Sequence, residues 1–169
     1  MGDGAGDPPL ADLVAGRAEA FAALYDRYAA KLYRAAVAML GSPQDAEDVV
    51  QEVFVSMVRS HNRLIAVRNL NAYLFTALRH AAHRRMMERS RLSLTDVDPP
   101  AIPVAETDDR LAQALNQLPT EQREVIALKI DGDLTFAQIG DALDISPNTA
   151  ASRYRYALQK LRRHLEAQS

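Results

Sequence analysis

The sequence predicts an all-α protein of two small helical domains, the second a helix-turn-helix domain, joined by a flexible acidic linker. Apolar residues recur at steps of three and four in both halves of the chain, and no convincing alternating strand pattern is present. They make up 48% of the 169 residues, which is enough to bury cores. Between the halves, residues 93–109 carry three prolines and five acids, which predicts an extended, mobile tether.

The composition also excludes several classes of protein. The net charge of -2 gives no global nucleic-acid signal, so charge has to be examined segment by segment. The absence of cysteine excludes disulfides, thiolate zinc sites and thiol catalysis. The first residues do not resemble a signal peptide, and no stretch approaches the roughly 20 apolar residues of a membrane span. We therefore expect a cytoplasmic protein that does not insert into the membrane.

The first domain is expected over residues 18–92, after a tail that includes the start of the first helix (residues 1–17). An apolar stripe predicts one long helix, on the residues Phe21, Leu24, Tyr25, Tyr28, Leu32, Val37 and Leu40. Gly41 ends this helix, and Ser42 with Pro43 begins the next as N-cap and first-turn proline. A third helix is expected from about Asn71 into a basic run that ends near Arg91.

The second domain is expected over residues 110–169. A helix begins at Pro119, with core candidates Val125, Ile126 and Ile130, and residues 131–133 form a turn. Thr135 and Gln138 fit a capping box. The following helix directs Phe136, Ile139 and Leu143 to one side, a tight turn occupies residues 144–145, and Ser146 with Pro147 begins the last helix. A short helix, a tight turn and a longer helix are typical of a helix-turn-helix unit.

The last helix has an apolar and a polar face. The apolar face consists of Ala150, Tyr154, Ala157, Leu158, Leu161 and Leu165. The opposite face and its flanks hold Asn148, Thr149, Ser152, Arg153, Arg155, Tyr156, Gln159, Lys160 and Arg163. Residues 148–164 include five Lys or Arg and no acid, which suits the major groove of DNA. The alternative is an ordinary solvated face.

The helix that follows Pro43 has an acidic face. Its buried stripe is expected on Ala46, Val50, Val53, Phe54 and Met57, opposite the residues Asp45, Asp48, Glu52, Val55 and Arg59. Acids do not favour DNA, but they suit a positively charged protein surface. The alternative is that the helix dipole alone stabilises them.

A third candidate surface is basic. Between residues 79 and 91, Glu88 is outnumbered by the arginines Arg79, Arg84, Arg85, Arg89 and Arg91, which suits phosphate contact or a solvated surface. An upstream loop could hold an unstacked base through Asn62, Asn69, Asn71 and Tyr73. His80 and His83 lack a matched carboxylate nearby, so we expect no metal and no cofactor. No phosphate loop, nucleophile elbow or zinc motif is present, so no enzyme is expected.

These segments resemble a known family. The helical domain of extracytoplasmic-function (ECF) sigma factors is similar to FAALYDRYAAKLYRAAVAMLGSPQDAEDVVQEVFVSMV, and its promoter-recognition domain to TFAQIGDALDISPNTAASRYRYALQKLRRHL. The resemblance covers about residues 18–91 and 111–166. The helix-turn-helix alone is an unspecific signal for this family. The segment DAEDVVQEVF, at this distance ahead of it, is a strong one.

The resemblance implies a sigma factor that directs core RNA polymerase to promoters. Its partners would be the β′ clamp and β flap of the polymerase, promoter DNA and an anti-sigma factor. Polymerase binding would fall to Asp45, Asp48, Gln51, Glu52 and Val55. Recognition and melting of the -10 element would fall to Asn62, Asn69, Tyr73, Arg79, His80, His83, Arg84 and Arg85. The -35 element would be bound by Asn148, Thr149, Ser152, Arg153, Arg155 and Tyr156.

Two departures leave the promoter sequence open. The family often carries Arg-Asn followed four residues later by Asp, where this chain has Arg79, His80 and Arg84. The recognition helix usually has Thr-Val-Lys-Ser-Arg, and residues 149–153 here are TAASR. A stand-alone regulator of the response-regulator type and a helical adaptor without a DNA role are the competing hypotheses. The first half lacks the alternating strands of a receiver domain.

Overall fold

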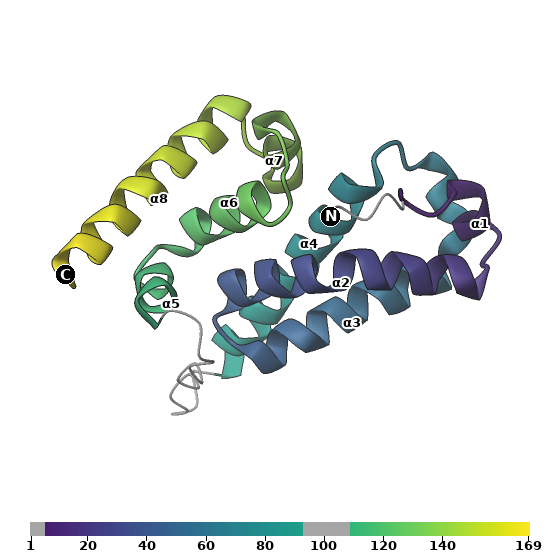
Figure 1. Cartoon of the computed structure of the whole chain (residues 1–169), viewed down its shortest axis with the longest axis horizontal. Helices are drawn as coiled ribbons and strands as arrows, with labels where there is room; N and C mark the ends of the chain where they lie inside the picture. The colour runs from purple at the N-terminus through teal and green to yellow at the C-terminus, as the bar shows by residue number, and fades with distance from the viewer. Residues whose placement is uncertain (1–5, 93–108) are drawn as a thin grey trace.

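The computed structural model describes residues 6–92 and 109–169, and these residues form helices without any strand. The first domain comprises α1 (Leu10–Val14), α2 (Ala18–Leu40), α3 (Pro43–Arg59), the 3-10 helix η1 (His61–Ala66) and α4 (Leu70–Leu92). The second domain comprises α5 (Asp109–Asn116), α6 (Thr120–Ile130), α7 (Phe136–Leu143) and α8 (Pro147–Ala167) (Figure 1). The predicted all-α class is confirmed. The predicted linker lies outside the described residues, except that Asp109 begins α5.

The helix boundaries that local sequence predicts are present. Gly41 ends α2 in the left-handed conformation, with φ of 67°, and its N–H donates to the Val37 carbonyl. The Ser42 hydroxyl accepts from the Asp45 amide at 3.3 Å at the start of α3. Thr135 and Gln138 form both bonds of the capping box at the start of α7. Each of these contacts satisfies a backbone group that a helix end leaves unpaired.

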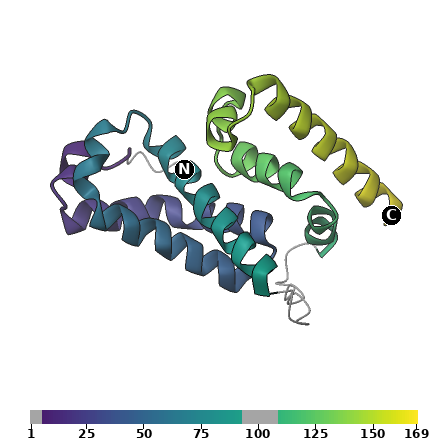
Figure 2. The ribbon, with the colours of Figure 1, turned by 180° about the vertical axis from the view of Figure 1, so that it is seen from behind.

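The first domain is built on α2, α3 and α4, which pack against one another around a shared core (Figure 2). The predicted stripe of α3 is buried throughout. In α2 the prediction is wrong for Tyr25, which is 51% exposed because it lies at the edge of a groove between α2 and α3. The short α1, which the sequence did not predict as a separate helix, packs against η1 and buries Leu13 completely.

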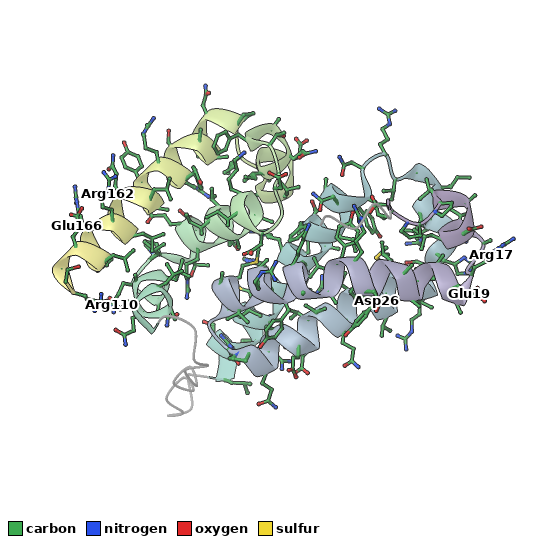
Figure 3. The ribbon with its side chains drawn as sticks, viewed as in Figure 1. Arg17, Glu19, Asp26, Arg110, Arg162 and Glu166 are labelled. Atoms are coloured by element: carbon green, nitrogen blue, oxygen red, sulfur yellow. The ribbon has the colours of Figure 1, made fainter. Side chains whose placement is uncertain are left out.

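The second domain places α6 and α7 against α8, with α5 beside the C-terminal half of α8, where Figure 3 shows Arg110 on α5 and Glu166 on α8. Two core predictions are wrong here. Ile130 is 58% exposed because it is the last residue of α6, where the chain turns away. Leu158 is 41% exposed because α7 leaves this part of α8 uncovered.

The two domains touch. α6 packs against α2, and α7 contacts α4, so that α6 lies between α8 and the first domain (Figures 1 and 2). Within the described residues, no helix is long and apolar enough to span a membrane.

Candidate nucleic-acid and protein-binding surfaces

A groove of about 590 Å³ lies between α2 and α3. It brings together three of the residues expected to bind polymerase, Asp48, Gln51 and Val55. The sequence analysis missed its other wall, which α2 supplies through Tyr25 and Tyr33. Tyr25 packs against Phe54 with ring centroids 5.0 Å apart, and the rest of its ring is open to solvent. The sequence signal for this wall was a tyrosine within an apolar stripe, because the hydroxyl of tyrosine favours a half-exposed position.

Three acids of α3, including Asp48 of the groove, lie against arginines of α4. Arg84 Nη2 donates to Glu52 Oε1 at 2.7 Å. Arg85 Nη2 donates to Asp45 and to Asp48, each at 2.9 Å. The acidic and basic surfaces that were predicted separately therefore form one network of ion pairs.

Arg89 completes this network. Its Nε donates to Asp45 Oδ2 at 2.7 Å, its Nη2 pairs with the same oxygen, and its Nη1 donates to the Leu40 carbonyl at 2.8 Å. Burial by itself would raise the pKa of Asp45, but the hydrogen bonds and charges of Arg85 and Arg89 outweigh it and hold the pKa below its usual value. Asp45 is thus a structural anchor between α2, α3 and α4, and only 16% of its side chain is exposed.

The loop between α3 and α4 is braced from the N-terminus. His61 Nδ1 lies 2.7 Å from the Val14 carbonyl of α1, and Leu64 is buried beneath the loop. Asn69 is an N-terminal cap, since its Oδ1 accepts from the Ala72 amide at 2.9 Å. The loop exposes Asn62, as expected for a residue that contacts DNA, and also Ile65, which is 74% exposed.

The candidate residues on α4 differ in their exposure and in their contacts. His80 and His83 are exposed, and burial together with the neighbouring arginines lowers the pKa of His80. Tyr73 is half-buried against the core. Asn71 and Arg79 contact the second domain. The structure therefore does not gather the eight -10 candidates on one open surface.

The candidate -35 residues lie along the N-terminal half of α8. The Ser146 hydroxyl accepts from the Thr149 amide at 3.1 Å and fixes the start of the helix. Asn148, Thr149, Arg155 and Tyr156 are exposed, and the Arg155 guanidinium lies 5.5 Å from the centre of the Tyr156 ring. Ser152 and Arg153 are half-buried on the same part of the helix, and Arg153 pairs with Glu121 of α6 at 3.6 Å.

A second groove, of about 710 Å³, lies on the outer side of α8. Its floor is apolar, formed by Phe136, Tyr154 and Leu158, and Arg155 and Arg162 stand at its edges. Among the described residues, no group of three or more His, Asp or Glu is arranged to hold a metal ion.

Two family profiles match the chain. The profile of Sigma-70 region 2 matches residues 24–92, and that of Sigma-70, region 4 matches residues 114–163. The ECF RNA polymerase sigma factor SigK of Mycolicibacterium vanbaalenii is 34% identical over 166 residues, covering 88% of this chain and 83% of that protein. SigL of Mycobacterium tuberculosis, another ECF RNA polymerase sigma factor, is 35% identical over 156 residues, covering 85% and 88%.

Two solved structures share the fold. The sigma factor RpoE of Bartonella quintana, in complex with the anti-sigma factor NepR, aligns with a TM-score of 0.76 at 24% identity, over 86% of this chain and 96% of that chain. CnrH, in complex with the cytosolic domain of CnrY, aligns with a TM-score of 0.72 at 28% identity, over 95% and 96%.

Proposed function

The chain belongs to the ECF family of RNA polymerase sigma factors, and from this membership we propose how its surfaces direct polymerase to promoters. The observation that carries the assignment is the order of two matched regions, region 2 followed by region 4, on one chain. A stand-alone regulator needs only the second region. The first domain therefore disfavours that alternative.

The groove between α2 and α3 is the proposed docking site for core polymerase. It combines a carboxylate, Asp48, with exposed apolar and aromatic side chains, Val55 and Tyr25. Such a mixture gives a partner both buried apolar area and a charge that fixes its orientation. Asp45 is excluded from direct contact because only 16% of its side chain is exposed and Arg85 and Arg89 both bind its carboxylate. Asp48 also accepts from Arg85, but 52% of its side chain is exposed.

This proposal predicts a difference between two neighbouring valines of α3. Val55→Glu places a charge inside the groove and should lower the affinity for core polymerase at least tenfold, which is about 1.4 kcal/mol. Val58→Glu is the matched control, since Val58 is 48% exposed on the same helix but does not line the groove. Affinity is measured by fluorescence anisotropy of the labelled chain. Equal loss in both variants contradicts the assignment of the groove.

A charge reversal of Asp48 and Glu52 is a less selective test of the groove than the valine pair. Changing Asp48 and Glu52 to lysine would abolish binding if both acids touched polymerase, but each is paired with an arginine of α4. Reversal would therefore also place like charges against Arg85 and Arg84. The comparison of Val55→Glu with Val58→Glu avoids this difficulty, because it does not replace an acid that is paired with an arginine.

The two DNA elements are assigned to opposite parts of the molecule. The N-terminal half of α8 binds the major groove of the -35 element through Asn148, Thr149, Arg155 and Tyr156, which are polar and exposed. The braced loop and α4 bind the -10 element, where the exposed Ile65 is suited to insert between unstacked bases. Burial and the neighbouring arginines lower the pKa of His80, which favours the neutral form of the ring.

The chain acts by binding, without catalysis of its own, in the cytoplasm, where polymerase and promoters are found. An anti-sigma factor is a proposed partner, since RpoE was solved with one. The apolar groove beside Arg155 and Arg162 is a candidate contact for the β flap of polymerase or for an acidic anti-sigma segment.

Reconstituted transcription tests the function. The purified chain and core bacterial polymerase are incubated with a fragmented genomic library, and the 5′ ends of the transcripts are mapped. Initiation at a discrete promoter set that depends on the chain is expected, and the promoters supply the -10 and -35 sequences. No polymerase binding and no transcripts from folded protein contradict the proposal.

A further inference from the structure

The 3-10 helix η1 has a buried face and an exposed face. A 3-10 helix has three residues per turn, so side chains three positions apart lie above one another. His61 and Leu64 therefore share one face, and Leu64 is only 1% exposed. Asn62 and Ile65 share another face, and both are exposed. The rotation of η1 about its own axis thus decides which side chains the loop presents to solvent.

Neither η1 nor α1 can fix this rotation alone. Runs of 3-10 helix longer than about four residues are uncommon because their hydrogen bonds are poorly aligned, and η1 extends over six residues. α1 has five residues, fewer than an isolated helix needs to be stable. Neither helix begins with a side-chain cap from the described residues. The two pack against each other at the right of Figure 1, and each depends on the other.

His61 closes the C-terminal end of α1. The carbonyls of residues 11–13 accept from the backbone amides of residues 15–17, each at 3.0 Å. The Val14 carbonyl accepts instead from His61 Nδ1, at 2.7 Å. Because a carbonyl can only accept, Nδ1 carries the proton in this contact. The bond satisfies a carbonyl that a helix end leaves without a partner.

Gly16 makes room for the imidazole ring. Its φ of 75° lies in the left-handed region, where a side chain causes strain. A Cβ atom there would also lie 3.2 Å from Cε1 and Nε2 of His61, closer than the optimal separation of about 3.5 to 4.0 Å. His61 is therefore held by a hydrogen bond to Val14 and by the adjacent backbone of Gly16. This fit leaves the start of η1 little freedom to rotate.

The chain ahead of α1 is anchored to α2. Tyr28 Oη donates to Asp7 Oδ1 at 2.7 Å, and Arg27 Nε lies 2.8 Å from the same oxygen. Leu13 of α1 is fully buried in the core. A continuous set of contacts thus runs from α2 through α1 to His61, and it holds the exposed face of η1 toward solvent.

We propose that His61 is a positioning residue for promoter melting. Its bond to Val14 fixes the rotation of η1, so that Ile65 faces the DNA, where it is suited to separate stacked bases. This inference rests on the proposed function. Because His61 does not line the polymerase groove, loss of its ring should slow melting and leave polymerase binding unchanged.

The test separates melting from binding. Polymerase assembled with the chain is mixed rapidly with a duplex promoter from the reconstitution, whose -10 element carries a fluorescent base analogue that brightens as it unstacks. His61→Ala should slow this rise in fluorescence by about fivefold to tenfold, the effect of one lost hydrogen bond. Its affinity for core polymerase, measured by fluorescence anisotropy, should equal that of the wild type.

Two conservative variants test the Nδ1 bond itself. The side-chain amide nitrogen of asparagine lies as many bonds from Cα as Nδ1 of histidine, whereas that of glutamine matches Nε2. His61→Asn should therefore melt the promoter faster than His61→Ala, and His61→Gln should not. Gly16→Ala should slow melting as His61→Ala does, because it displaces the ring. Gly6→Ala is its control, since a Cβ atom on Gly6 would meet nothing within 4 Å.

Three results would overturn the inference. The first is wild-type melting by His61→Ala. The second is an equal loss of polymerase affinity in that variant, which would show that His61 supports the whole domain. The third is melting by His61→Asn that is no faster than by His61→Gln, which would remove the bond to Val14 as the cause. Absence of melting by the wild-type chain would instead contradict the proposed function, and the inference with it.

Discussion

At the scale of single residues, the buried Glu124 makes contact between the domains dependent on pH. Burial raises the pKa of Glu124, against the opposing charges of Arg79 and His83 on α4 and of Arg153 on α8. Burial also raises the pKa of Asp131, against Arg34. A carboxyl with a raised pKa binds its proton more tightly while it is buried at the contact between the domains than when it is in water. Acidification therefore favours contact between the domains, and the contact weakens as the pH rises above the raised pKa values.

This dependence predicts a more compact chain at mildly acidic pH. The radius of gyration should fall as the pH is lowered from neutral toward the ordinary carboxyl pKa, measured by scattering at constant ionic strength. Glu124→Gln cannot titrate and should flatten this response, leaving the smaller part that comes from Asp131. An unchanged slope in Glu124→Gln would show that Glu124 is not the responding group.

Arg89 is predicted to be a large contributor to the stability of the first domain. It joins Asp45 to the end of α2, and hydrogen bonds to charged groups contribute about 2 kcal/mol. Arg89→Ala should lower the free energy of unfolding by about that amount, measured in urea. Arg91→Ala, an exposed arginine of the same helix, should change it little.

The contribution of the ion pair between Asp45 and Arg89 to stability depends on pH. The pKa of Asp45 is lowered, so its contribution is present above the ordinary carboxyl pKa and is lost as the pH falls through the lowered value. The Arg89→Ala defect should therefore shrink in strong acid. A defect that is constant with pH would assign the loss to packing instead of to the ion pair.

At the scale of elements, the turn between α7 and α8 depends on Gly140. A Cβ atom there would lie 2.6 Å from the Ile145 carbonyl, which is backbone and cannot move aside cheaply. Alanine normally stabilises a helix relative to glycine. We expect the opposite here, a loss of about 1 to 3 kcal/mol for Gly140→Ala together with weaker -35 binding. Asp141→Ala, at an exposed site on α7, is the control in the same urea titration.

Local sequence signals predicted the helices whose first residues include a capping side chain. Helices α3, α7 and α8 have Ser42, Thr135 and Ser146 as their N-caps, whose side chains accept the expected backbone hydrogen bonds. The sequence analysis did not identify α1, η1 and α5. The first two are short and depend on each other through the contact between Val14 and His61, and α5 depends on α8. Periodicity over a few residues cannot reveal an element that only tertiary packing stabilises.

The surfaces were less predictable than the helices, because the charges of one segment do not reveal which other segment packs against it in the fold. The acids of α3 and the arginines of α4 were assigned to separate partners, and they pair with each other across the domain. Likewise Arg79 was assigned to DNA and lies against Glu124, more than 40 positions along the chain. On the N-terminal half of α8, Asn148, Thr149, Arg155 and Tyr156 are exposed as the helical pattern predicts, whereas Arg153 pairs with Glu121 of α6. The DNA-binding role of this face stays a prediction.

At the scale of the whole molecule, one hydrophobic cluster extends through both domains. It includes Leu32 and Phe75 of the first domain together with Leu128 and Ile139 of the second. When either of two domains that share a core unfolds, the other loses the free energy of their contact. Their unfolding is therefore coupled. The second domain also has a small core of its own between α5, α6 and α8, which supports it after separation.

Calorimetry measures this coupling directly. The wild-type chain should unfold in one thermal transition, with a van't Hoff enthalpy close to the calorimetric enthalpy, because both domains lose the shared cluster together. Arg34→Glu weakens the contact between the domains without touching either core, so its scan should separate into two transitions, each with the smaller enthalpy of a smaller unit. Asp131→Arg on that background should merge them again. Two transitions already present in the wild type would show that the shared cluster adds little stability and does not couple the unfolding of the two domains.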